Sequence, residues 1–114
     1  MNDRHLIASF LEAMRAERGA SENTIVAYAR DLADYIDHLG ATGLLAAKQT
    51  DVESYLAALA DMGLAASTRA RRLSSARQLH RFLYEDGLRD DDPSARISGP
   101  RKARSLPKTL SEQE

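Results

Sequence analysis

Apolar residues recur every three or four positions in four stretches of this chain, the spacing of one face of an α-helix. In the second stretch, for example, Ile25, Leu32, Ile36 and Leu39 form an apolar stripe that ends at Gly40. No stretch alternates apolar and polar residues between hairpin signals, so the sequence predicts no β-strand. The predicted fold class is therefore all-α, a compact bundle of four main helices plus a short fifth. The main helices are expected at about 4–18, 22–39, 51–62 and 68–86.

Residues that typically begin helices flank these stretches. Ser21 is a good N-cap for the second helix, and Ser67 is predicted to cap the fourth. The Thr-Asp-Val-Glu sequence at 50–53 has the spacing of a capping box, so the third helix is expected to begin there. Asp92 and Pro93 place a cap before a proline at the first helical position, which predicts a short final turn or helix at 93–97.

The chain changes character after residue 97. Residues 98–110 contain two prolines and no helical periodicity, which is typical of an extended linker that follows a helical domain at 1–97. Residues 111–114 resemble the cap and first turn of a helix in a further, truncated domain.

The chain has no cysteine, which excludes a disulfide framework and a thiolate site. It also has no apolar run long enough to span a bilayer, so we expect a soluble, cytoplasmic protein with no membrane partner.

Charge is sorted by region, although the formal net charge is only −1. Residues 1–61 carry five Lys/Arg and ten Asp/Glu, whereas residues 62–114 carry eleven and seven. The predicted helix at 68–86 holds Arg69, Arg71, Arg72, Arg77 and Arg81, with no acidic residue between positions 62 and 84. A second acid-free basic stretch spans residues 93–111. Two such stretches indicate a polyanionic partner, because phosphate neutralisation supplies most of the non-specific free energy of nucleic-acid binding.

The five arginines cannot all face one ligand. The apolar side of this helix is predicted to face the core and consists of Leu73, Ala76, Leu79, Phe82 and Leu83. At about 100° per residue, Arg77 and Arg81 share a strip with Ser74, Arg72 flanks the apolar side, and Arg71 falls opposite. Arg72 could instead pair with an acid of the second or third helix. A solvated basic face remains the alternative for the whole set.

Most catalytic and cofactor chemistry is not supported by the sequence. His5, His38 and His80 lack the spacing of metal ligands, so no metal and no cofactor are expected. The chain has no glycine-rich phosphate loop and no Ser/His/Asp arrangement. The tyrosines have apolar neighbours at helical spacing and are expected to pack in or beside the core, so no catalytic residue is assigned. They are Tyr28, Tyr35, Tyr55 and Tyr84.

Several short motifs, taken in order, resemble the N-terminal core-binding domain of the tyrosine recombinase (phage integrase) family, which is SAM-like. They are Ser-Glu-Asn-Thr at 21–24, Arg-Asp-Leu at 30–32, Arg-Arg-Leu-Ser-Ser-Ala-Arg at 71–77, Phe-Leu-Tyr at 82–84, Asp-Pro at 92–93 and Leu-Pro-Lys at 106–108. The chain is most similar to the Xer recombinases, and closer to the XerD than to the XerC branch. The resemblance covers nearly the whole chain.

The resemblance implies one half of a C-shaped clamp on double-stranded DNA, with the catalytic half beyond residue 114. Positions that match the family's approach to the major groove are Thr24, Arg71, Ser74 and Arg77. Thr24 could equally be a capping or helix-surface hydroxyl. Val26 and Ala27 stand where relatives carry polar groups, so shape and backbone contacts are expected to dominate. The predicted DNA-binding residues are Thr24, Arg71, Arg72, Ser74, Arg77, Arg81, Arg101, Lys102 and Arg104.

The linker residues Arg101, Lys102 and Arg104, with Lys108, are expected to cross the DNA backbone between the two lobes and to become ordered there. A linker that is merely soluble is the alternative.

The resulting hypothesis is a DNA-binding domain of a site-specific recombinase that acts in chromosome dimer resolution. The fragment itself should be inactive and monomeric. In the parent enzyme, the resemblance implies a tyrosine that attacks the scissile phosphate, within a tetramer of two related recombinases. Two rival functions remain open at this point: a helical protein-interaction module with a basic patch, and a helix-turn-helix transcription regulator.

Overall fold

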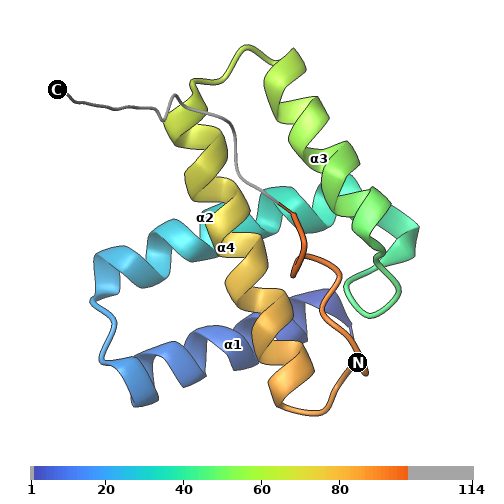
Figure 1. Ribbon diagram of the computed structural model, residues 1–114. Coiled ribbons are helices and arrows are strands. Elements are labelled where there is room, and N and C mark those ends of the chain that lie inside the picture. Colours follow the sequence, from blue (N-terminus) through green and yellow to red (C-terminus); the bar gives the residue numbers. More distant parts are fainter. Residues whose placement is uncertain (1, 98–114) are drawn as a thin grey trace, which may run out of the picture.

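Four α-helices and one short 3₁₀ helix form in the part of the chain that the computed structural model describes, residues 2–97 (Figure 1). No strand occurs among these residues, which confirms the predicted all-α fold and its four main helices. The predicted linker and the predicted start of a further domain lie outside the described residues. The elements are α1 (Asp3–Arg18), α2 (Glu22–Leu39), η1 (Gly40–Thr42), α3 (Gln49–Asp61) and α4 (Ala66–Glu85).

The first two helices begin and end almost where their caps predict. Asn2 Oδ1 accepts a hydrogen bond from the backbone N–H of His5 at 2.8 Å and so caps α1. Gly19 then ends α1 with a φ of 62°, a conformation that glycine adopts without a Cβ penalty. Ser21 Oγ accepts from the backbone N–H of Thr24 at 3.2 Å, as expected of the N-cap of α2.

The last two helices begin two residues earlier than predicted. The Asp51 carboxylate accepts from the backbone N–H of Lys48 at 2.8 Å, so Asp51 stands at the third position of α3 and Lys48 takes the cap position expected of Thr50. In α4 the cap position is Ala65, whose carbonyl accepts from the backbone N–H of Arg69, and Ser67 lies inside the helix. Arg69 Nε also donates to the Leu64 carbonyl at 3.1 Å. Leu64 packs against the core, and this packing brings the start of α4 forward.

The segment after α4 folds back along the helix and ends in a turn at residues 93–96 (Figure 1). Asp92 Oδ1 accepts from both the backbone N–H and the hydroxyl of Ser94, at 2.9 and 2.7 Å. The predicted short final turn is therefore present as a turn. The one short helix among residues 2–97 is the 3₁₀ helix η1, which lies in the expected connection between α2 and α3.

The core lies where α4 crosses α1 and α2, with α3 packed beside them (Figure 1). The predicted core face of α4 is confirmed, because Leu73, Ala76, Leu79 and Leu83 are all buried and Phe82 packs at the margin. Burying each leucine contributes about 1.5–3 kcal/mol of transfer free energy. Since one face of α4 is committed to this core, the opposite face is left at the surface.

Candidate nucleic-acid interface

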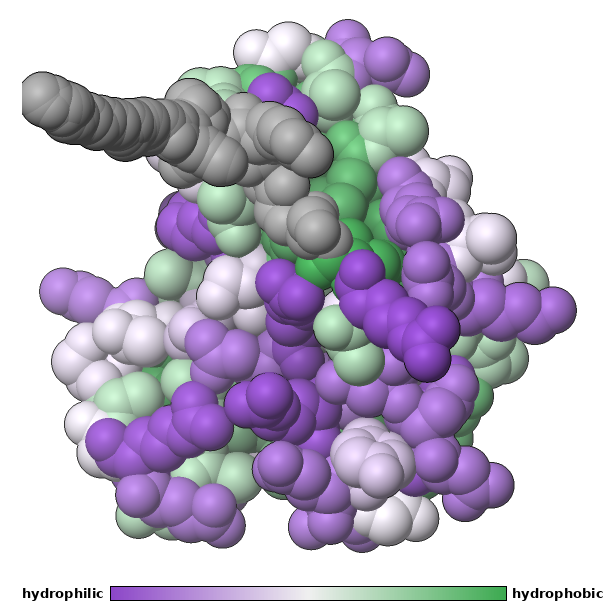
Figure 2. Space-filling view, in the orientation of Figure 1, coloured by the Kyte–Doolittle hydropathy of each residue, from purple (hydrophilic) through white to green (hydrophobic). Residues whose placement is uncertain are grey.

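The exposed face of α4 forms one side of a cleft with a volume of about 300 Å³. Ser74, Arg77 and Arg81 line it from the helix, and Asp92 and Ser94 line it from the segment that folds back. Figure 2 shows hydrophilic residues gathered over the face where α4 lies in front. Neither Arg77 nor Arg81 forms an ion pair with any residue in the described range, 2–97. Their guanidinium groups are therefore free to meet an anion.

Arg71 and Arg72 are directed instead toward acidic residues of α2. Arg71 Nη1 donates to Asp31 Oδ2, and Arg72 Nη1 donates to Asp34 Oδ2. The two arginines differ in exposure, because 51% of the Arg71 side chain but only 19% of the Arg72 side chain is accessible. Tyr55 of α3 also donates to Asp34 Oδ2, at 3.2 Å. The contacts of Arg72 thus hold α4 against α2 and α3, the internal pairing that the sequence left open, whereas Arg71 reaches from the interior to the surface.

Thr24 occupies the first turn of α2 and is exposed. Its Oγ1 accepts a hydrogen bond from Ser21 Oγ at 3.0 Å, while its backbone N–H donates to the same Ser21 oxygen. The Thr24 hydroxyl is thus part of the N-cap and also accessible to a ligand. Val26, half exposed two residues later, adds no polar group to this turn.

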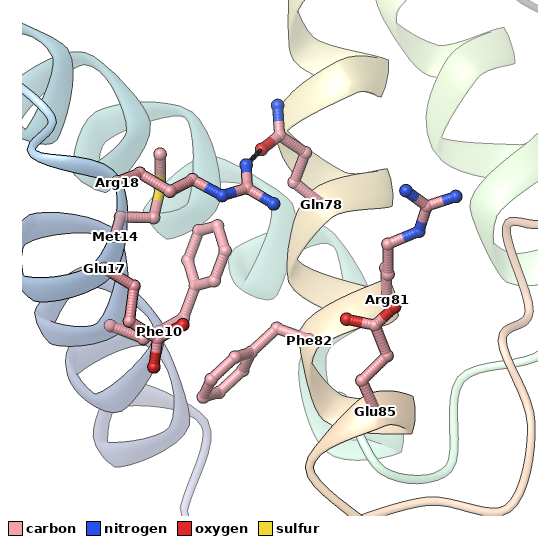
Figure 3. A pocket seen from close by; sticks show the side chains of 9 residues that line it. Phe10, Met14, Glu17, Arg18, Gln78, Arg81, Phe82 and Glu85 are labelled. Carbon is pink, nitrogen blue, oxygen red and sulfur yellow. Dashed lines mark hydrogen bonds between the residues drawn. The ribbon is translucent and has the colours of Figure 1, made fainter.

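A second cleft, of about 310 Å³, lies between α1 and α4 (Figure 3). Arg18 from α1 and Arg81 from α4 reach its rim above the rings of Phe10 and Phe82, whose centroids are 5.6 Å apart. Arg18 Nη1 donates to Gln78 Oε1 at 2.8 Å, the bond drawn in Figure 3. Glu17 and Glu85 line the same cleft, so its two arginines are balanced by two carboxylates, and the contact joins α1 to α4 without making a positive patch.

Sequence reasoning missed the contributions of Arg18 and Gln78. Arg18 stood at a helix C-terminus, where a basic residue needs no further explanation. Gln78 is partly buried, and its Nε2 donates to Tyr28 Oη at 2.7 Å, so it bridges α1, α2 and α4. Helical spacing could have indicated that Gln78 belongs to this surface, since Gln78 follows Ser74 by four residues and precedes Arg81 by three.

Linker residues Arg101, Lys102, Arg104 and Lys108, predicted to cross the DNA backbone, lie outside the described residues. Their roles stay predictions.

Three of the four tyrosines pack as predicted. Tyr35 and Tyr55 are almost fully buried, and Tyr28 is half-buried beside Phe10. Burial raises the pKa of Tyr55 to about 12 and also raises the pKa of Tyr35, so both phenols stay protonated near neutral pH. Tyr84 departs from the prediction, because it lies on the outer side of α4 with half of its surface exposed.

No group of three or more His, Cys, Asp or Glu side chains arranged to hold a metal ion occurs within residues 2–97. Over the same range, no helix has the length and apolar character needed to cross a membrane.

The comparison with protein families matches residues 7–87 to the family described as phage integrase, N-terminal SAM-like domain. The chain is 53% identical over 107 residues to the tyrosine recombinase XerD of Agrobacterium fabrum. It is 52% identical to the protein of that name from Rhizobium meliloti and 43% identical to that from Caulobacter vibrioides. These matches cover 92–93% of the chain but only 32–35% of the relatives, so the chain spans about a third of their length. The resemblance to Xer recombinases is thereby confirmed, and the chain belongs to the phage integrase N-terminal SAM-like domain family.

Proposed function

We propose that this domain binds double-stranded DNA through the exposed face of α4 and the first turn of α2. The observation that carries the proposal is the pair Arg77 and Arg81, which line a surface cleft beside Ser74 and form no ion pair within residues 2–97, although Asp92 lines the same cleft. Arginine binds phosphate or guanine through a planar fork of donors, and a serine or threonine hydroxyl can add a contact to the backbone. Membership of the integrase family supports DNA as the polyanion.

The residues of the proposed interface differ in how directly they are expected to contact DNA. Ser74, Arg77 and Arg81 form its centre, and Arg71 lies one turn earlier on the same helix. Thr24 is a separate member, exposed in the first turn of α2. Arg72 contributes mainly by holding α4 in place, because most of its side chain is buried against Asp34. Arg101, Lys102 and Arg104 are proposed to continue the interface along the chain.

For the parent protein, we propose a site-specific recombinase of the kind that the relatives' name, tyrosine recombinase XerD, describes. The domain described here would hold one side of a recombination half-site, and a following domain would supply the tyrosine nucleophile. Chromosome dimer resolution, with two related recombinases in a tetramer, is the proposed biological task. Its cytoplasmic location follows from the same proposal.

Binding to duplex DNA tests the proposal directly. We expect the 114-residue chain to bind a fluorescein-labelled 30-base-pair duplex of mixed sequence at low salt, measured by fluorescence anisotropy. With about four to seven phosphates engaged, log affinity should fall against log salt concentration with a slope of roughly −4 to −6. No binding at low salt would refute the proposed function and favour a protein partner for the basic face.

Arg77→Ala should reduce the magnitude of that slope by about one if Arg77 contacts a phosphate. If it reads a guanine instead, affinity should fall by about 1–3 kcal/mol on duplexes that contain that base. Arg4→Ala is the matched control, because Arg4 lines a separate groove between α1 and α2. Equal effects of the two substitutions would show that total charge, and not the α4 face, governs binding.

A further inference from the structure

Asp31 is a buried carboxylate directly beneath the arginine-rich face of α4. It is 2% exposed, and its Oδ2 accepts from Arg71 Nη1 and from Ser75 Oγ, the latter at 3.0 Å. Ser75 is itself fully buried. Asp31 Oδ1 is buried too and has no hydrogen-bond partner within residues 2–97. Among the described residues, Arg71 is therefore the one cation within ion-pair distance of this carboxylate, while Arg72 lies near enough for its charge to be felt.

This arrangement constrains Arg71 through one guanidinium nitrogen, Nη1, and leaves the other nitrogens without a contact to Asp31. A carboxylate removed from water needs a paired, hydrogen-bonded cation, so releasing Arg71 from Asp31 is strongly unfavourable. A guanidinium carries five N–H donors, however, and Asp31 engages Nη1. Half of the Arg71 side chain remains accessible, which leaves donors available at the surface. The guanidinium is thereby anchored at Nη1 before any ligand arrives, with its other donors toward the surface.

We propose that Asp31 is a positioning residue for nucleic-acid binding, which orients Arg71 so that this arginine recognises DNA by the geometry of its donors and not by its net charge. The inference rests on the proposed DNA-binding function and adds a division of labour within it. Arg77 and Arg81 supply unpaired charge, whereas Arg71 supplies a preformed fork.

The two kinds of arginine should differ in how their contribution depends on salt. An unpaired arginine that neutralises a phosphate releases a counterion and adds about 0.9 to the magnitude of the slope. The Asp31–Arg71 pair carries no net formal charge, so its removal should leave the slope nearly unchanged. What the pair contributes is the avoided cost of immobilising a long side chain, which corresponds to roughly a 3- to 10-fold change in affinity.

The double variant Asp31→Asn/Arg71→Gln isolates this contribution, because it removes both charges and keeps side chains of similar size. We expect its affinity for the 30-base-pair duplex to fall about 3- to 10-fold, with the salt slope within about 0.3 of the original chain. Arg77→Ala is the contrast and should lower the magnitude of the slope by about 0.9. Thermal melts by circular dichroism establish that the variants are folded at the assay temperature.

Arg71→Lys provides a second test that leaves Asp31 paired with a cation. Lysine keeps the charge but lacks the planar fork, so the same loss of affinity with an unchanged slope is expected. Full affinity in Arg71→Lys would overturn the proposal, because charge alone would then suffice. Unchanged affinity in the double variant would overturn it too, since Asp31 would then act only in folding. A slope reduced by about 0.9 in the double variant would instead make Arg71 an ordinary charge contact. Failure of the original chain to bind the duplex is a different result and would refute the DNA-binding function itself.

Discussion

At the scale of single residues, His80 is a basic side chain of α4 that lies in the core and not at the surface. His80 is fully buried, and its Nε2 lies 2.7 Å from Tyr35 Oη, with the two rings nearly perpendicular. Its Nδ1 has no partner within residues 2–97. Burial, with a smaller contribution from the nearby positive charge of Arg89, lowers the pKa of His80 to about 4. The side chain is therefore neutral near pH 7 and adds packing, not charge, to α4.

This lowered pKa predicts a loss of stability on acidification. The unfolded chain takes up a proton at His80 near pH 6.5, whereas the folded chain does so only near pH 4. The free energy of unfolding should therefore be unaffected by His80 above pH 6.5 and should decrease between pH 6.5 and pH 4, by up to about 3 kcal/mol. Urea unfolding at several pH values measures this change.

His80→Gln is the control for that measurement, because glutamine cannot titrate. The variant should be less stable near neutral pH, but its stability should depend less steeply on pH between 6.5 and 4 than that of the original chain. Parallel pH profiles for the two proteins would contradict the assignment.

At the scale of elements, α2 decides what the arginines of α4 can do. Asp31 and Asp34 are three residues apart, so they lie on the same side of α2, and they receive Arg71 and Arg72 of α4. Arg77, one and two-thirds turns further along α4 than Arg71, meets no acid of α2 and lines the surface cleft instead. The two helices thus divide the basic residues between holding the fold together and facing the solvent.

The N-cap of α2 provides a test at this scale. Ser21→Ala removes the acceptor of the Thr24 backbone N–H and should lower the free energy of unfolding by about 1 kcal/mol, measured by urea titration. Thr24→Val is the matched control, because it removes only the hydroxyl and keeps the backbone bond; its effect should be smaller. Equal losses would mean that the bond between the two hydroxyls, and not the cap, carries the stability.

At the scale of the whole molecule, Leu44 joins both ends of the described chain to the loop between α2 and α3. Its backbone N–H donates to Asp3 Oδ1 at 3.0 Å, and its carbonyl accepts from Arg89 Nη1 at 2.8 Å. Arg89 is largely buried and also pairs with Asp91 at 2.9 Å. Ile97 is buried as well, so the segment after α4 is anchored to the domain up to its last described residue.

Arg89→Ala should therefore loosen this segment. The substitution leaves the Leu44 carbonyl without its hydrogen-bond donor, which predicts a loss of about 1–3 kcal/mol in the free energy of unfolding. Hydrogen exchange should show faster exchange at Ile97, whose backbone N–H donates to the Ser94 carbonyl. Arg96→Ala is the control, because Arg96 is exposed in the same segment and its loss should stay within about 0.5 kcal/mol. Equal destabilisation by both would mean that the segment is not anchored through Arg89.

The sequence by itself determined the helices, the all-α class, the acid-free basic stretch at 62–84 and the family, because periodicity, caps and short motifs depend on residues that are neighbours in the chain. It placed α2 to the residue and the core face of α4, from Leu73 to Leu83, correctly. Only the tertiary structure decided which arginines are free. The partners of Arg71 and Arg72 lie 40 and 38 residues earlier in the chain, and the partner of Arg18 lies 60 residues later. Such pairs depend on how α4 is rotated about its axis against α1 and α2, and that rotation is set by the packing of all four helices together.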